Sequence, residues 1–286
     1  MLASLAEVLD AHRERGTAAG AFTCYGMEGA AAVLRAAVAN ESPGVILLIS
    51  PQAFAAELGE ALLATLLALG ERSPVRVCVQ LDHAPELAPI RRALEAGAGA
   101  VMADGSRLGF EQNVALAAAA VELARASGAQ VEVELGHVAG DEEAAAATRA
   151  GSFTDPAEAR ELVERSGASC LAVSIGNVHG HYAGEPRLDL DLLDEVRATV
   201  DVPLALHGAS GLPDRLVAAA IERGIAKINV NTELRGAFVA ALEAELPAAR
   251  EGLRVQRLAA AAADAVAAVA LEKLRLFETN HGGGPE

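Results

Sequence analysis

Eight short apolar runs recur along the sequence, and each is followed by a longer amphipathic stretch. The runs are mostly apolar and β-branched residues are frequent in them, as in strands that are buried on both faces. Eight successive strand–helix units predict an α/β protein whose parallel strands close into a single (β/α)8 TIM barrel. The runs are residues 18–24, 44–50, 75–82, 100–104, 130–136, 170–176, 203–209 and 227–232.

The length of 286 residues is that of one such barrel, so we predict a single domain over residues 1–286. Asp155-Pro156, with Glu158 three residues after the aspartate, predicts the start of a helix, and Arg223-Gly224 predicts an end. Residues 137–153 form a connection too long for an ordinary strand–helix loop, which predicts an active-site lid. A terminal helix is expected from about residue 255, followed by a frayed tail at about 278–286.

Composition excludes several classes of function. The net charge is -16 without a basic cluster, which argues against binding to nucleic acid or to an anionic membrane. No apolar run approaches the roughly 20 residues of a membrane span, and the N-terminus lacks the features of a signal peptide, so we expect a cytoplasmic protein. Cys24, Cys78 and Cys170 lie far apart inside apolar runs and are predicted to be reduced core residues.

Three histidines lie at the carboxyl ends of three different predicted strands, where barrel enzymes build their active sites. Together His83, His179 and His207 form the ligand set of a catalytic divalent metal, with Zn²⁺ expected first and Co²⁺ or Mn²⁺ as alternatives. Asp104 follows the fourth predicted strand, and Glu134 lies in the fifth. They are either ordinary rim carboxylates or groups that orient the histidines and offer an alternative metal position. The remaining histidines are expected at the surface: His12, His137, His181 and His281.

Two segments after the last two strands predict a phosphate site. HGASG at 207–211 precedes a helix with Pro213 in its first turn, and NVNT at 229–232 precedes the next helix. Loops at these two places, facing helix N-termini, are the usual phosphate site of barrels. Asp82, beside a candidate metal ligand, is in a position suited to acid–base work. The predicted substrate-binding residues are Ser50, Gly180, Gly208, Ala209, Ser210, Asn229, Val230, Asn231 and Thr232.

Six motifs that occur in order along the chain resemble the class II fructose-bisphosphate and tagatose-bisphosphate aldolases. The resemblance runs from about residue 18 to about residue 240. The motifs are LDH (81–83), DGS (104–106), EVELG (132–136), IGNVHG (175–180), LHGASGLP (206–213) and KINVNTEL (227–234).

The resemblance implies a role for each matching residue. His83, His179 and His207 would bind the metal, Asp82 would donate a proton at the aldehyde oxygen, and Asn229 would contact the enediolate. Gly180, Gly208, Ser210 and Thr232 would form the dihydroxyacetone phosphate pocket. It also implies a monovalent cation such as Na⁺ or K⁺ near the phosphate and a homodimer or homotetramer.

The lid glutamate of the family matches Glu142, with Glu143 adjacent. On this scheme the metal acidifies dihydroxyacetone phosphate, Glu142 removes a proton, and Asp82 protonates the new alkoxide. Cleavage is the reverse and gives dihydroxyacetone phosphate and an aldehyde such as glyceraldehyde 3-phosphate.

The sequence departs from the family pattern where the acceptor aldehyde would bind. The first strand reads Gly20-Ala21-Phe22-Thr23 with Gly26 shortly after, Ala84 replaces the usual second histidine, and the tail NHGGGPE offers no match to the family's C-terminal arginine. Fructose or tagatose 1,6-bisphosphate is therefore the first expected substrate, and a deoxy or monophosphorylated sugar phosphate is the alternative.

Three rival functions agree less well with these residues. A Schiff-base aldolase needs a desolvated lysine, and Lys227 and Lys273 lie at the start of the last strand and in the terminal helix. A metal-dependent hydrolase would share the histidines but would not explain HGASG and NVNT together. A non-catalytic accessory barrel subunit would not need the complete set of Asp82 and three histidines.

Overall fold

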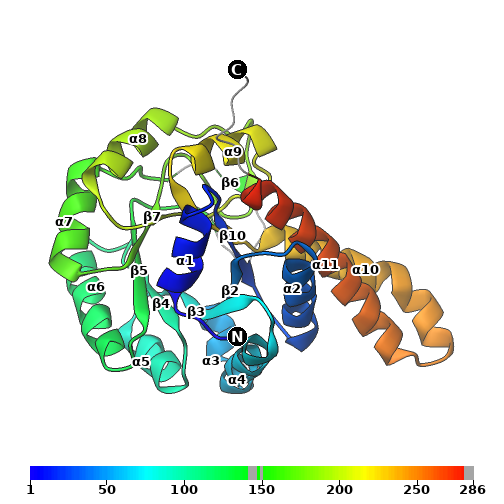
Figure 1. Cartoon of the computed structure of the whole chain (residues 1–286). Coiled ribbons are helices and arrows are strands. Elements are labelled where there is room, and N and C mark those ends of the chain that lie inside the picture. The colour runs from blue at the N-terminus through cyan, green and yellow to red at the C-terminus, as the bar shows by residue number, and fades with distance from the viewer. Residues whose placement is uncertain (141–146, 149–150, 280–286) are drawn as a thin grey trace.

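The computed structural model describes residues 1–140, 147–148 and 151–279, and in this part of the chain parallel strands close into a barrel (Figure 1). Around the barrel the strands follow chain order, so each pairs with its predecessor and β1 pairs with β10. The predicted (β/α)8 fold is confirmed. The barrel strands are β1 (Ala19–Thr23), β2 (Gly44–Ile49), β3 (Arg76–Ala84), β4 (Ala100–Ala103), β5 (Gln130–Leu135), β7 (Cys170–Val173), β9 (Leu204–Leu206) and β10 (Ile225–Val230).

Helices surround the barrel, as the amphipathic stretches predict. The N-cap expected at Asp155 is present, since its side chain accepts hydrogen bonds from the amides of Ala157 and Glu158. The end expected at Arg223-Gly224 is also present, with Gly224 at φ 98°. The helices are α1 (Leu5–Arg13), α2 (Met27–Ala39), α3 (Pro51–Ala55), α4 (Gly59–Arg72), α5 (Leu87–Glu95), α6 (Phe110–Arg125), α7 (Pro156–Ser166), α8 (Leu190–Thr199), α9 (Asp214–Glu222), α10 (Thr232–Glu251) and α11 (Val255–Glu278).

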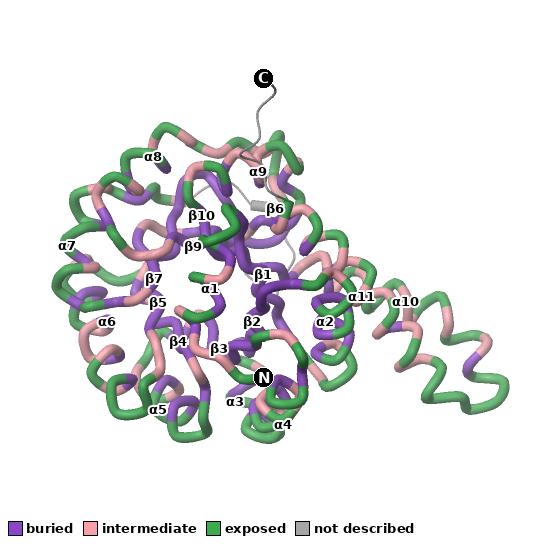
Figure 2. Tube along the Cα trace, in the orientation of Figure 1, coloured by how far each residue is buried: buried purple, intermediate pink, exposed green. Residues whose placement is uncertain are grey.

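Side chains alternate between the barrel interior and the surrounding helices because successive strand residues point to opposite faces. On β2, Ile46 and Leu48 belong to an inner apolar cluster, whereas Val45, Leu47 and Ile49 belong to the outer cluster beneath the helices. Figure 2 shows this continuous buried zone along the strands. Helix α1 contributes Leu5, Val8 and Leu9 to the inner cluster, and their i, i+3, i+4 spacing places them on one face.

Toward the carboxyl ends of the strands the inward positions change from apolar to polar. On β3 the series runs Cys78, Gln80, Asp82, and on β5 it runs from Glu132 to Glu134; all five are buried. The barrel thus has an apolar base and a polar upper layer. Cys24, Cys78 and Cys170 are buried free thiols, as predicted.

The segment predicted as a lid contains a short strand among its described residues. β6 (Ala147–Thr148) pairs in parallel with β8 (His181–Tyr182), which follows strand β7. Glu142 and Glu143 lie outside the described residues, as does the tail after residue 279.

Helices α10 and α11 pack against each other and extend away from the barrel as an arm (Figure 1). The expected terminal helix is confirmed as α11. Among the described residues no helix has the length and apolar character needed to cross a membrane. Large apolar side chains are exposed along the arm: Phe238, Val239, Leu246, Leu253 and Val255.

His12 is not a surface residue, so that expectation is wrong. His12 is 0% exposed. Its Nδ1 contacts Thr17 Oγ1 at 3.1 Å, and its Nε2 contacts the Gly44 carbonyl at 2.9 Å. Burial lowers the pKa of His12 to about 4, so it is neutral near pH 7. Helical position alone did not reveal this, because the partners lie in a turn and on strand β2. His137 is half-buried and His181 is exposed.

We expect His12 to make the fold less stable in acid. Its pKa rises from about 4 in the fold to the ordinary 6.5 on unfolding, so stability present at pH 7.5 is lost as the pH falls toward 5. The loss attributable to this residue is about 2 kcal/mol at pH 5. Denaturant unfolding of the metal-free His12→Gln protein should therefore show a correspondingly weaker pH dependence. His181→Gln, at an exposed histidine, should match the wild type. If the free energy of unfolding depends equally on pH in all three proteins, His12 is not responsible for the acid sensitivity.

Candidate active site

Three histidines come together at the carboxyl end of the barrel. The ring centroids of His83 and His179 are 5.0 Å apart, and those of His83 and His207 are 4.7 Å apart. One nitrogen from each ring can be chosen so that all three lie within 4.8 Å of one another. The structure thus brings together the three residues that the sequence proposed as metal ligands.

A local irregularity in β3 lets two adjacent residues serve the site. The β3–β4 register shifts between Leu81 and Ala84, and His83 has φ 40°, in the left-handed region that a non-glycine residue rarely adopts. In a regular strand Asp82 and His83 would face opposite sides. Such local strain is often found where function needs a particular orientation.

Acidic partners orient two of the imidazoles. His83 Nδ1 lies 2.7 Å from Asp104 Oδ2, and His207 Nε2 lies 2.8 Å from Glu132 Oε1. When each of these nitrogens donates to its carboxylate, His83 Nε2 and His207 Nδ1 carry lone pairs that face each other at 2.8 Å. Facing lone pairs repel unless a proton or a cation lies between them. This arrangement therefore fits a divalent metal held by imidazole nitrogens.

The protonation of the histidines agrees with this fit. Burial, together with the neighbouring imidazoles, lowers the pKa of His179 well below its usual range. Burial also lowers the pKa of His207, although its bond to Glu132 acts in the opposite direction. Neutral imidazole is the form that binds metal ions.

Asp104 and Glu134 form a second donor set with His83. Donor atoms from these three residues also lie within 4.8 Å of one another. Burial and then the charge of Asp104 raise the pKa of Glu134 to about 8, whereas the contact with His83 lowers the pKa of Asp104 despite its burial. Both carboxylates therefore adjoin the metal pocket, and their oxygens could serve as orienting groups or as an alternative position for the ion.

Asp82 lies beside the histidines on the inner wall of the barrel. Its side chain is 1% exposed, and Oδ2 accepts a hydrogen bond from Asn229 Nδ2 at 3.1 Å. Among the described residues Oδ1 has no hydrogen-bond partner. The free oxygen leaves Asp82 able to exchange a proton with a ligand bound at the rim.

The two Gly-rich segments border one small depression next to His179. Gly208 has φ 61°, and a Cβ built on it would lie 2.1 Å from the Val178 carbonyl oxygen, so a side chain cannot be accommodated there. Helix α10 starts at Thr232 beside the depression, so its N-terminal amides and helix dipole are available to an anion. The lining residues are His179, Gly180, Gly208, Ser210, Asn229, Asn231 and Thr232.

Three of the predicted substrate-binding residues do not line this depression. Ser50 caps helix α3 by accepting from the amide of Ala53 at 3.2 Å. The side chains of Ala209 and Val230 pack in the outer apolar cluster, which leaves only their backbones for a ligand. Pro213 is the N-cap of α9, one position before the expected first turn.

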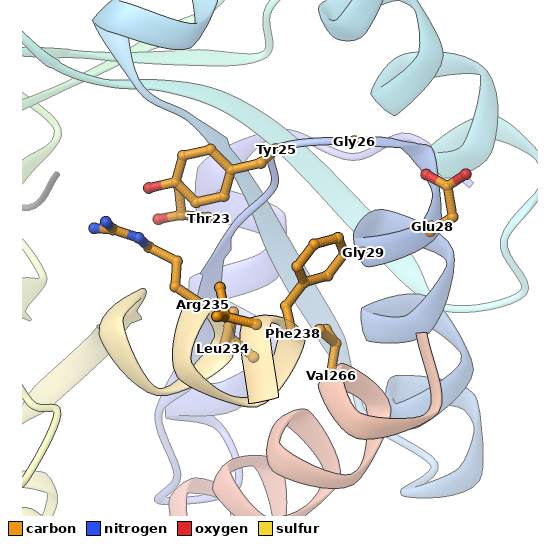
Figure 3. A pocket seen from close by; sticks show the side chains of 10 residues that line it. Thr23, Tyr25, Gly26, Glu28, Gly29, Leu234, Arg235, Phe238 and Val266 are labelled. Carbon is orange, nitrogen blue, oxygen red and sulfur yellow. The ribbon is translucent and has the colours of Figure 1, made fainter. Parts of the chain in front are cut away.

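A larger cavity of about 460 Å³ lies between β1, α2 and α10 (Figure 3). Arg235 is on its wall with its guanidinium 5.9 Å from the ring of Tyr25, and Tyr25 Oη donates to Asn231 Oδ1 at 3.0 Å. Because Asn231 also lines the depression, the two hollows are adjacent. Thr23 and Gly26, where the sequence departs from the family pattern, line the same cavity.

The sequence analysis did not predict a role for Arg235, because the arginine of the family pattern belongs to the C-terminal tail. The available signal was its spacing, since it follows Thr232 by three residues and so shares a helix face with a predicted phosphate-site residue. Glu142 and Glu143 lie outside the described residues. Gly140, just before them, lines a cleft of about 290 Å³ with His83 and His137.

Removing one histidine should abolish stoichiometric metal binding. We expect His83→Ala, His179→Ala and His207→Ala each to reduce bound Zn²⁺ or Co²⁺ from about one ion per chain to a small fraction, because a three-ligand site loses a ligand. His181→Ala is the control, since this exposed histidine on β8 is outside the cluster. Metal analysis after dialysis measures the result, and retention of the full complement in all three variants would overturn the site.

Comparison with known proteins agrees with this geometry. The family model described as "Fructose-bisphosphate aldolase class-II" matches residues 3–282. The chain is 37% identical over 283 residues to a "Probable fructose-bisphosphate aldolase" of Bacillus subtilis (strain 168), covering 98% of this chain and 99% of that protein. The crystal structure of the YdjI aldolase from Escherichia coli K12 matches with a TM-score of 0.86 and 33% identity over 99% of both chains. The chain belongs to the class II fructose-bisphosphate aldolase family.

Proposed function

We propose that this protein is a zinc-dependent aldolase that reversibly cleaves a ketose 1,6-bisphosphate of the fructose or tagatose type. The products would be dihydroxyacetone phosphate and an aldehyde such as glyceraldehyde 3-phosphate. The observation that carries the proposal is that three imidazoles able to hold a metal ion, a buried aspartate and a small depression bordered by a helix N-terminus meet at one rim. Membership of the family supports the reaction type.

His83, His179 and His207 would hold the divalent ion, in a family that generally uses one. Zn²⁺ suits three imidazoles best, and Co²⁺ or Mn²⁺ would be alternatives. When bound, the ion supplies Lewis acidity to the ketone and hydroxyl oxygens of dihydroxyacetone phosphate. The resemblance adds Na⁺ or K⁺ beside the phosphate.

Residues of the chain would bind the phosphate and transfer the protons. The depression between His179 and Thr232 would seat the phosphate of dihydroxyacetone phosphate, with amides of α10 facing it. Glu142 would take the proton from the adjacent carbon, and Asp82 would give and take the proton at the hydroxyl that becomes the aldehyde oxygen. Asn229 would hold the enediolate while it donates to Asp82.

The rival functions fit this structure less well. Lys227 is 0% exposed and paired with Glu132 at 2.8 Å, and Lys273 is paired with Glu233 at 2.9 Å, so neither is suited to form a Schiff base. A metal-dependent hydrolase would share the histidines but would not explain why HGASG and NVNT border one depression beside them. An accessory subunit would not need Asp82 placed against Asn229.

We also infer a homodimer or homotetramer in the cytoplasm. The exposed apolar side chains along α10 and α11, among them Phe238 and Leu246, support association because isolated arms seldom leave such groups in water. The barrel and its arm are taken as one domain.

Asp82→Asn should separate proton exchange from cleavage. Asparagine can keep the contact with Asn229 but cannot carry the proton, so carbon–carbon cleavage should fall by roughly 10²–10⁴-fold. Metal content and tritium exchange from labelled dihydroxyacetone phosphate should stay near the wild-type level. Cleavage at the wild-type rate would remove Asp82 from the proposed mechanism.

Arg235 should determine the preference for a second phosphate. The guanidinium lies in the cavity next to the depression, and loss of a charge-assisted contact to a phosphate costs roughly 1.5–3 kcal/mol. Arg235→Met should therefore raise KM about 10–100-fold for fructose or tagatose 1,6-bisphosphate and leave monophosphorylated ketoses unchanged.

A panel of phosphorylated ketoses, assayed for triose phosphate release with metal present, measures this effect. Arg223→Met is the control, since Arg223 lies at the end of α9 beside Asp194. An equal effect on bisphosphates and monophosphates would show that Arg235 does not contact a second phosphate. If no ketose is cleaved and dihydroxyacetone phosphate does not exchange, the accessory-subunit alternative replaces the aldolase.

A further inference from the structure

A buried ion pair lies inside the barrel, one layer below the candidate active site. Lys227 on β10 and Glu132 on β5 are both 0% exposed, and Lys227 Nζ lies 2.8 Å from Glu132 Oε2. The proposed reaction does not use either residue directly. Their contacts nevertheless reach both the metal pocket and the proton donor.

Glu132 connects the pair to the metal pocket. Its Oε1 accepts from His207 Nε2 at 2.8 Å, and its Oε2 also accepts from Gln80 Nε2 at 2.8 Å. Because Nε2 of His207 is held as a donor, Nδ1 is left to face His83. The carboxylate thus fixes both the tautomer and the ring orientation of His207.

Lys227 connects the pair to the proton donor. Its Nζ donates to Asn229 Oδ1 at 2.7 Å, and Asn229 Nδ2 donates to Asp82 Oδ2 at 3.1 Å. An ammonium group can only donate, so it requires the oxygen of the carboxamide to face it. The NH₂ group must then face Asp82, and the orientation of Asn229 is determined by chemistry.

Stability alone does not account for this pair. Taking two charges out of water is costly, and apolar side chains of similar volume often serve a protein core as well or better. Residues of the inner apolar cluster lie beside the pair, since Met102 and Cys170 are the register partners of Glu132 and Ala205 is that of Lys227, so this barrel can fill its interior without charges. Each member of the pair instead contacts a residue of the candidate site, Glu132 through His207 and Lys227 through Asn229.

We propose that Lys227 and Glu132 are positioning residues that set the orientations of His207 and Asn229 together. This inference rests on the proposed aldolase function. The ion pair makes one connected chain from the metal ligand through Glu132, Lys227 and Asn229 to Asp82. Neither member of the pair touches the reacting atoms. Their effect is to hold the metal pocket and the proton donor in fixed relative orientation.

The double variant Lys227→Met/Glu132→Leu tests the proposal, because it removes the acceptor of His207 Nε2 without leaving a buried charge of the pair unpaired. Metal-free protein is titrated with Co²⁺, and the visible absorption reports the geometry of the bound ion. We expect the dissociation constant to rise about 10–100-fold, as for loss of other groups that orient ligands, with an altered absorption spectrum. Circular dichroism and denaturant unfolding establish that the variant is folded.

The second arm of the test concerns Asn229. With Co²⁺ saturating, cleavage should slow by about tenfold more than tritium exchange from dihydroxyacetone phosphate, because only cleavage needs the proton of Asp82. A general loss of packing would slow both steps equally. Ile46→Ala, in the inner apolar cluster, is the control for such a loss and should leave the ratio of the two rates unchanged.

The outcomes separate this inference from the proposed function. If the wild type binds Co²⁺ and exchanges tritium while the folded double variant matches it in affinity, spectrum and rate ratio, the positioning role is overturned and the aldolase proposal stands. If the wild type neither binds Co²⁺ nor exchanges tritium, both proposals fall. If the double variant does not fold, Lys227→Met/Glu132→Met is measured by the same criteria, and failure of both to fold overturns the positioning role in favour of a structural one.

Discussion

Closure of the barrel places every second strand residue in a space without water, and the rest of the structure depends on how that space is filled. At the base it holds apolar side chains and is covered by Leu5, Val8 and Leu9 of α1. At the carboxyl end it holds buried charges and imidazoles, which are tolerable only when each has a partner. The polar upper layer is therefore a bonded network, in which Glu132 contacts both Lys227 and His207.

Sequence patterns predicted the barrel well because its strands are mostly apolar and stand out from the helices. Strands β7 and β9 end three residues before the predicted ends, and β10 begins at Ile225 and not at residue 227. An inward lysine interrupts the apolar run there, and only its pairing with Glu132 on another strand makes Lys227 compatible with the middle of a buried strand. A short stretch of sequence cannot show such a pairing, because the two residues lie on different strands.

In the candidate site too, local sequence position identified some residues, whereas contacts between distant segments determine the role of others. His83, His179 and His207 could be found from position, since strand ends converge in any barrel. Residues whose role depends on a distant neighbour were missed or misplaced. His12 was expected at the surface, yet it contacts the Gly44 carbonyl. Arg235 follows Thr232 by three residues, but its place beside the site is shown by Tyr25, which is bonded to Asn231 across 206 positions of sequence.

The depression next to His179 and the adjacent cavity differ in which parts of the chain form them, and this difference affects how substrate specificity can change. The depression next to His179 is formed largely by glycine and helix-terminal backbone, whose shape depends on tight contacts such as that of Gly208 with the Val178 carbonyl. The adjacent cavity is formed by the side chains of Thr23, Tyr25 and Arg235. Thr23 Oγ1 is buried there without a hydrogen-bond partner among the described residues, so a ligand group can satisfy it. Under the proposed function, substitutions in the cavity would therefore alter the accepted aldehyde and leave the candidate metal pocket intact.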